Sequence, residues 1–153
     1  MRMVLRLTAL LAVLLIGLSA QVSAEAARGT ADEAKAMVAR AIAAYDAEGS
    51  AALAEMNAPS TAFRDRDLYV FVYGPDRRIA AHGADAAHVG HDVAEYADVD
   101  GKRFAVEIME RATADGVWVD YKWKDPLSGE ERPKSTWVVL HDGYVFGCGI
   151  YKD

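Results

Sequence analysis

The side chain with the clearest chemical potential in this sequence is Lys134, which lies in a strand-like stretch rich in apolar residues. It follows Pro133, and strand alternation places it on one face with Thr136 and Val138. A lysine in this setting is either solvated at a sheet edge or buried, and a buried ammonium is costly without an anion. An anion about 4 Å away would contribute roughly 4 kcal/mol at an effective dielectric of about 20. Lys134 is therefore a candidate partner for a bound carboxylate, with a solvated edge lysine as the alternative.

Aromatic side chains on two predicted strands are the candidate walls of such a pocket. Tyr121 and Trp123 share one strand face, and Tyr69 and Phe71 share one face of an earlier strand. A buried phenol needs a hydrogen-bond partner, which a carboxylate ligand would provide. The alternative is that these rings only fill the core of a sheet that is covered by helices.

Histidines and carboxylates gather in the segment that follows the second predicted strand. They are His82, His88, His91, Asp85 and Asp92. Imidazole and carboxylate are ordinary zinc ligands, so a metal-binding protein is one alternative function. The residues have no common helical register, and the pattern is equally that of a solvated loop. His82, at the strand end, is expected instead to line the ligand pocket.

No arrangement typical of an enzyme is found. The single cysteine, Cys148, has no histidine at a spacing that indicates a nucleophile pair, and neither Gly-x-Ser-x-Gly nor a phosphate-binding loop is present. Cys148 has no second cysteine for an internal disulfide and is expected to fill the core. The sequence therefore predicts binding without catalysis and without a cofactor.

The first residues have the pattern of a secretory leader. Arg2 and Arg6 precede an apolar run, and small residues then predict cleavage before Glu25. The run is short for a membrane span, and an uncleaved N-terminal anchor is the alternative. We therefore expect a signal peptide at residues 1–24, a single domain at residues 25–153 and a periplasmic location.

The charge of the expected mature chain excludes some partners. Without the leader it has 15 basic and 23 acidic residues, a formal net charge of −8. This excess of negative charge argues against nucleic acid or an anionic membrane surface as partner. It does not oppose a small anion, because one local ion pair outweighs distant, screened charges.

Helices are predicted at the start of the expected mature chain. Thr30 and Glu33 have the spacing of a capping box, and an apolar stripe predicts a helix that ends at Gly49 and lies on one face of a sheet. A second, short helix is predicted from an N-cap at Ser50 to Met56.

Strands follow. Residues 68–73 are wholly apolar or aromatic and predict a strand that is covered on both faces. Residues 78–82 return as a second strand, and residues 116–151 alternate as three more, joined by Asp-Pro, Ser-Gly and Asp-Gly turns. The predicted class is α+β, with a five-stranded antiparallel sheet. Trp137, on the face opposite Lys134, is predicted to pack under the long helix.

A helical insert separates the second and third predicted strands. It comprises a polar loop at residues 83–90, one helical turn at residues 93–96 and a helix at residues 102–115. The apolar stripe of that last helix places Phe104 on its inner face.

This order of elements resembles that of PAS-like sensor domains, and several strings narrow the resemblance to single Cache domains of the second subfamily. Those strings are Gly49 with Ala51, Ala52 and Leu53; Asp67 to Val72; Ala81 and His82; Val89 and Gly90; Asp98 with Asp100, Gly101, Lys102 and Phe104; Gly116, Trp118, Val119, Tyr121 and Trp123; Pro133 and Lys134; and Gly147, Gly149, Ile150 and Tyr151. Their order and spacing, over residues 31–151, carry the resemblance.

The resemblance implies an extracytoplasmic ligand-binding fold, whose characterised members bind small carboxylates such as acetate, propionate, pyruvate or lactate. After Tyr151 only two residues remain, so we expect a free-standing periplasmic member that passes its signal to a membrane receptor or kinase. The expected site combines Lys134 as the anion partner with the walls named above. An interaction module without a small ligand, forming a homodimer through the residue 30–49 helix, is a further alternative.

Overall fold

The computed structural model describes residues 28–59 and 62–152, so the predicted leader at residues 1–24 lies outside the described residues. None of the helices in these two ranges is long and apolar enough to cross a membrane.

Helix α1 (Ala31–Glu48) begins and ends as its sequence predicts. The Thr30 hydroxyl accepts from the Glu33 backbone N–H at 3.3 Å, and the Glu33 carboxylate accepts from the Thr30 N–H at 2.8 Å. This confirms the capping box. Gly49 ends the helix with φ 59°, a conformation that favours glycine. Helix α2 (Ser50–Met56) follows directly, and Gly49 rather than Ser50 is its N-cap because Ser50 is already helical; the predicted Ser50 cap is wrong.

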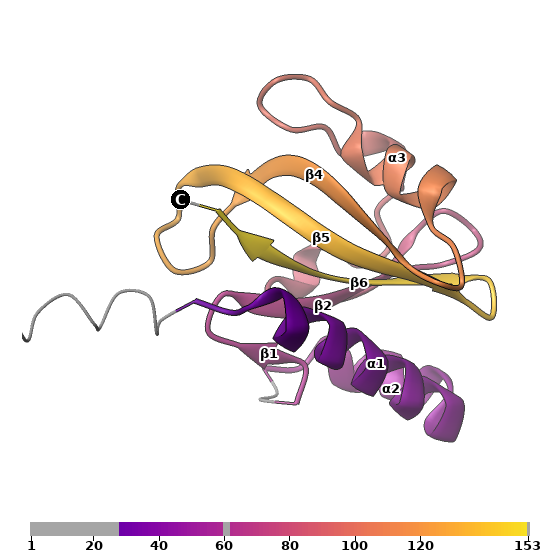
Figure 1. Cartoon of the computed structure of the whole chain (residues 1–153). Helices are drawn as coiled ribbons and strands as arrows, with labels where there is room; N and C mark the ends of the chain where they lie inside the picture. The colour runs from indigo at the N-terminus through magenta and orange to yellow at the C-terminus, as the bar shows by residue number, and fades with distance from the viewer. Residues whose placement is uncertain (1–27, 60–61, 153) are drawn as a thin grey trace, which may run out of the picture.

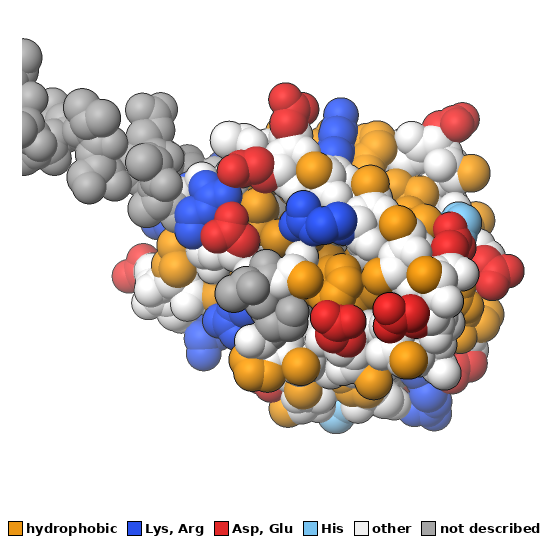
Figure 2. Space-filling model, turned by 90° about the horizontal axis from the view of Figure 1, so that it is seen from below, with side chains coloured by type: hydrophobic (Ala, Val, Ile, Leu, Met, Phe, Trp, Pro, Cys, Tyr) orange, Lys and Arg blue, Asp and Glu red, His pale blue; other side chains and the backbone are white. Residues whose placement is uncertain are grey.

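The outer surface of the two helices carries both charges. Figure 2 shows this side of the molecule, where acidic, basic and apolar side chains are interspersed. The inner stripe of α1 is buried against the sheet and consists of Ala34, Met37, Val38 and Ala41. The amphipathic stripe thus accounts for the position of the helix.

The sheet is antiparallel, and the predicted five strands are confirmed. They are β2 (Leu68–Tyr73), β3 (Ile79–His82), β4 (Val117–Lys124), β5 (Glu131–His141) and β6 (Tyr144–Tyr151). Their spatial order is β3-β2-β6-β5-β4, so that the last strand lies at the centre. A two-residue strand, β1 (Arg64–Asp65), also pairs with β2 and was not predicted.

The two faces of the sheet have different coverings (Figure 1). Helices α1 and α2 lie on one face, here called the α1 face, and the insert (residues 83–116) covers the other, here called the insert face. All six residues of β2 are buried, as predicted for a strand covered on both sides. Trp137 packs on the α1 face with Lys35 Nζ 4.7 Å from the centre of its ring, which confirms its predicted orientation.

The insert contains two short 3₁₀ turns, at Ala86–His88 and Val93–Glu95, and helix α3 (Phe104–Arg111). The helix is shorter than the predicted 102–115. At its end the chain becomes extended at Ala112, and the Thr113 carbonyl accepts from the backbone N–H of Leu140 at 2.9 Å. Docking onto β5 therefore replaces the last helical turn.

Side chains and insert backbone occupy both edges of the sheet. On the β4 edge, Lys102 Nζ donates to the Asp120 carbonyl, and the Lys122 backbone N–H donates to the Asp98 carboxylate at 3.1 Å. On the β3 edge, the Ile79 backbone exchanges hydrogen bonds with the insert. These contacts satisfy backbone groups that an open edge leaves unpaired.

Candidate functional site

A narrow cavity of about 10 Å³ lies between the insert face of the sheet and the insert, which is room for about one water molecule. A ligand larger than water therefore requires the lining side chains to move apart. It is lined by Tyr69, Phe71, Tyr73, Ile79, His82, Tyr96, Phe104, Tyr121 and Trp123. Of the predicted site residues, all except Lys134 are in this lining. The cavity therefore gathers side chains from β2, β3, β4 and the insert at one place.

Stacked aromatic rings form the wall on the β4 side. The rings of Phe104 and Tyr121 are parallel to within 2°, with centroids 4.1 Å apart, and Phe104 meets Trp123 edge-on at 5.0 Å. The Tyr121 hydroxyl accepts from Thr136 Oγ1 at 3.0 Å, which satisfies this buried phenol. Tyr96 was not predicted at the site, because it lies in an irregular segment whose position only the folded insert defines.

Lys134 is buried beside the cavity rather than within its lining. Its side chain is among the largest fully buried ones, at 1% exposure. Nζ donates to the Tyr69 hydroxyl at 2.7 Å, and it lies 4.0 Å from the centre of the Tyr69 ring and 4.8 Å from that of Tyr151. Burial lowers the pKa of Lys134 from 10.5 to about 7. The alternative of a solvated edge lysine is thus wrong. Lys134 contacts the lining of the cavity through the Tyr69 hydroxyl.

Two glycines of the central strand make room on the insert face. A Cβ at Gly149 would lie 2.4 Å from both Lys134 Cε and Thr136 Oγ1, and a Cβ at Gly147 would lie 2.3 Å from the ring of Phe71. Cβ atoms do not come so close to other heavy atoms, so a side chain at either position would displace Lys134, Thr136 or Phe71. The sequence offers a signal for this: two glycines alternate within a strand-like stretch, which marks a close approach.

His82 is a neutral hydrogen-bonding group at the cavity. Its Nδ1 accepts from the Asp85 backbone N–H at 3.0 Å, which leaves the proton of the neutral ring on Nε2. Burial, together with the nearby His88 and Lys134, lowers the pKa of His82 to about 3. At neutral pH the ring therefore presents Nε2–H as a donor without a charge.

The other histidines of the proposed metal loop have different partners. His88 Nδ1 lies 2.8 Å from the Tyr96 hydroxyl, and His91 Nδ1 lies 3.1 Å from the Glu95 carboxylate at the surface. Among the described residues, no three His, Cys, Asp or Glu side chains converge in a way that would hold a metal ion. The metal hypothesis gains no support from this geometry.

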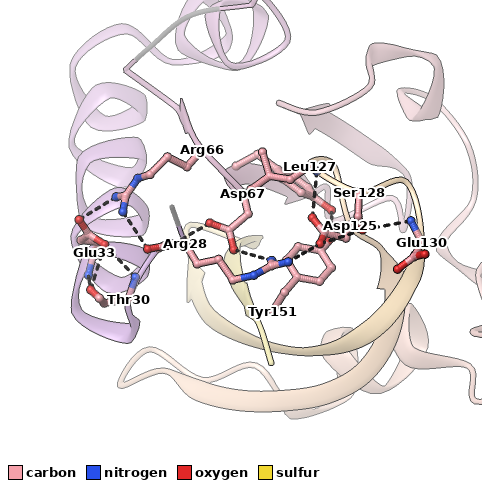
Figure 3. A network of polar contacts seen from close by, with 12 residues as sticks. Arg28, Thr30, Glu33, Arg66, Asp67, Asp125, Leu127, Ser128, Glu130 and Tyr151 are labelled. Carbon is pink, nitrogen blue, oxygen red and sulfur yellow. Dashed lines mark hydrogen bonds and ion pairs between the residues drawn. The ribbon is translucent and has the colours of Figure 1, made fainter. Parts of the chain in front are cut away.

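A network of ion pairs closes the end of the sheet near Tyr151 (Figure 3). Arg28 donates to Asp67 at 3.4 Å and to Asp125 at 2.7 Å, and both carboxylate side chains have no exposed surface. Burial opposes ionisation of Asp125, but the bond from Arg28 and those from Leu127 and Ser128 prevail and lower its pKa. The start of the described chain is thereby tied to the β1–β2 and β4–β5 turns. Sequence reasoning missed this network.

The family model described as Single Cache domain 2 matches residues 8–153. The chain belongs to the single Cache domain 2 family. This confirms the family that the sequence motifs suggest, and it agrees with the observed order of strands and the helical insert.

Relatives of this Cache domain include sensory proteins. It is 33% identical over 90 residues to the sensor histidine kinase MctS of Rhizobium johnstonii, a match that covers 58% of this chain and 20% of the kinase. A solved periplasmic sensor domain of a chemotaxis protein is 26% identical, with a TM-score of 0.59 over 80% of this chain and 90% of that one. A Cache chemosensory domain solved to explain carboxylic acid recognition has a TM-score of 0.57 at 19% identity, over 80% and 88%. The match to this chain thus spans only a fifth of the length of the kinase.

Proposed function

We propose that this Cache domain reversibly binds a short-chain monocarboxylate of the acetate, propionate, pyruvate or lactate type in the cavity described above. The observation that carries the proposal is Lys134, a buried lysine whose amine forms no ion pair with any described Asp or Glu and bonds to a hydroxyl of the cavity wall. A buried cation of this kind is stabilised by a bound anion. The structural likeness to a carboxylic-acid-recognising Cache domain is consistent with this ligand class.

The ligand's carboxylate would lie against Tyr69 and His82. The Tyr69 hydroxyl accepts from Lys134 and lies 3.4 Å from the Tyr151 hydroxyl, whose own proton goes to the Lys124 carbonyl. Tyr69 therefore donates to Tyr151 in the empty site, and a bound carboxylate would compete for this proton. His82 offers Nε2–H as a second donor. The aliphatic part of the ligand would face Phe71 and Phe104. A second charge on the ligand would meet aromatic rings and a neutral imidazole, so dicarboxylates and amino acids should bind more weakly.

Reversible binding rather than catalysis fits the chemistry of the lining. The titratable side chains there are tyrosines and one histidine, and burial raises the pKa of Tyr69, Tyr73 and Tyr121 above the ordinary value. Phenols in that state are weak nucleophiles. The cavity therefore has donors that orient an anion and no activated group that attacks one.

Location and partners form part of the same proposal. The leader pattern at residues 1–24 and the kinship with sensory proteins support a periplasmic domain that reports its occupancy to a membrane receptor or kinase. The outer surface of α1, the helix predicted at residues 30–49, remains the proposed contact for a homodimer.

The test is thermal unfolding of the protein expressed from its full sequence, with two- to four-carbon monocarboxylates, succinate, amino acids and zinc. A ligand at a hundred times its Kd stabilises the folded state by about 2.7 kcal/mol, which raises Tm by several degrees in a domain of this size. Monocarboxylates should raise the Tm of the wild type. They should have no effect on Lys134→Met, which keeps the volume of the side chain and removes its charge.

Lys122→Met is the matched control. Lys122 lies on neighbouring β4 with its side chain 43% exposed and pairs with Asp100 at the surface. This variant should respond to carboxylates as the wild type does. A response to zinc alone would favour the histidine loop, and no response to any compound would favour an interaction module.

A further inference from the structure

Lys134 lacks the partners that a buried ammonium requires. It has three N–H donors, and the structure shows one hydrogen bond, to Tyr69, together with two aromatic rings. In the part of the chain that the structure describes, no carboxylate pairs with it. An isolated buried charge of this kind is avoided by loss of the proton. The empty site therefore favours a neutral amine, whereas a site that holds an anion favours the ammonium.

Among the groups that surround Lys134, the phenols, the thiol and the imidazole do not gain or lose a proton near neutral pH. The titratable and charged groups around it are Tyr69 of β2, His82 of β3, Tyr121 of β4, Cys148 and Tyr151 of β6, and Asp67 and Asp125 at the strand ends. Burial raises the pKa of the three phenols and raises that of the Cys148 thiol to about 12, whereas the pKa of His82 falls to about 3. The two carboxylates are both held by Arg28. The phenols, the thiol and the imidazole thus keep their charge state between about pH 6 and pH 9.

We propose that this site takes up its carboxylate together with one proton, which Lys134 binds as the anion enters, so that occupancy depends on both carboxylate and proton concentrations. The inference rests on the proposed function. The balance is simple: a carboxylate and one proton from the buffer join the neutral amine to give an ion pair, and no covalent bond changes. The Tyr69 hydroxyl lies between the two charges, since it accepts from Lys134 and Tyr69 also lines the cavity. In the empty site its proton points to the Tyr151 hydroxyl, 3.4 Å away, and it would turn to the carboxylate when the anion enters.

The expected pH dependence follows from the empty-site pKa of Lys134. With a value of about 7, the amine is about one tenth neutral at pH 6, half neutral at pH 7 and nine tenths neutral at pH 8. The proton uptake per bound anion should therefore rise from about 0.1 to about 0.9 over this range. The apparent affinity should fall about tenfold from pH 6 to pH 8, because the neutral amine must first be protonated.

The experiment is isothermal titration calorimetry of the wild-type protein with sodium acetate, propionate, pyruvate and L-lactate. Each titration is repeated at pH 6, 7 and 8 in phosphate and in a buffer with a large heat of ionisation, so that the difference in heat gives the number of protons taken up. The proposal expects near-zero uptake at pH 6 and nearly one proton at pH 8. Binding with the same heat in both buffers at every pH would overturn it and leave the proposed function intact.

His82→Gln identifies the group that takes up the proton. A glutamine amide donates from nearly the position of Nε2 and has no titration in this range. Uptake that persists in this variant supports Lys134, and uptake that disappears while binding is retained assigns the proton to His82 and overturns the inference. If none of the four carboxylates binds at any pH, the proposed function itself fails, and this inference fails with it.

Discussion

Lys134 should destabilise the empty protein, and the effect can be measured without any ligand. The pKa of Lys134 falls from 10.5 to about 7 on folding, and at about 1.4 kcal/mol per pH unit this corresponds to about 5 kcal/mol against the charged form. Between these two pKa values the unfolded chain binds more protons than the folded one, so stability rises with pH. The penalty is fully present below about pH 7 and is lost as the pH approaches 10.5.

Lys134→Met removes this dependence. Methionine fills a similar volume without a charge, although it loses the hydrogen bond to Tyr69, which is worth about 1 kcal/mol. The variant should therefore be more stable than the wild type by about 4 kcal/mol at pH 6, and the gap should close by about pH 10.

Urea unfolding followed by tryptophan fluorescence gives both free energies across this pH range. Titrations of all other groups are common to the two proteins and cancel in the difference. Lys122→Met, which changes an exposed lysine of the same sheet, should follow the wild-type curve. A constant difference between Lys134→Met and wild type from pH 6 to pH 10 would show that Lys134 keeps its proton in the empty fold and would refute the reasoning.

Two other substitutions test the surroundings of the site. Arg28→Ala leaves the buried carboxylates of Asp67 and Asp125 without their shared cation and should lower the free energy of unfolding by about 3 kcal/mol at pH 7. The loss should be smaller at pH 4, because protonation of Asp125 removes its unpaired charge. Urea unfolding at the two pH values measures this, and an equal loss at both would contradict it. Gly149→Ala forces a methyl group against Lys134 Cε and should cost about 1–3 kcal/mol of stability and weaken carboxylate binding. A Gly149→Ala protein with wild-type stability and affinity would show that Lys134 has room to move.

The elements that local rules determine were predictable from the sequence. The Thr30 and Glu33 capping box fixed the start of α1, and the apolar run of β2 predicted a strand buried on both faces, because each depends on neighbours within a few residues. The end of α3 was not predictable in this way. The predicted last turn does not form, because the Thr113 carbonyl instead accepts a hydrogen bond from Leu140 of β5, which is distant in the sequence.

The side chains that line the candidate cavity were largely predicted, but their arrangement around Lys134 was not. Strand alternation correctly grouped Tyr121 with Trp123, but period alone cannot say that Lys134 lies beside the lining and bonds to Tyr69, which is 65 residues away in the chain. The Arg28 network could not be predicted from the sequence either, because its ion pair to Asp125 joins residues separated by 97 positions. Such contacts exist only once the sheet order brings the turns together.

The occupied sheet edges restrict how another protein can recognise this domain. Many recognition modules receive an extended peptide that adds a strand to an open edge. Here Lys102 and Asp98 already bond to backbone groups of β4, and the insert already bonds to β3. The receptor or kinase proposed above would therefore find few free backbone groups on the β3 and β4 edges, and the side-chain surfaces of α1 and α2 or of the insert are its expected contacts. Such recognition would depend on shape and charge, and point substitutions on those surfaces should abolish it without unfolding the domain.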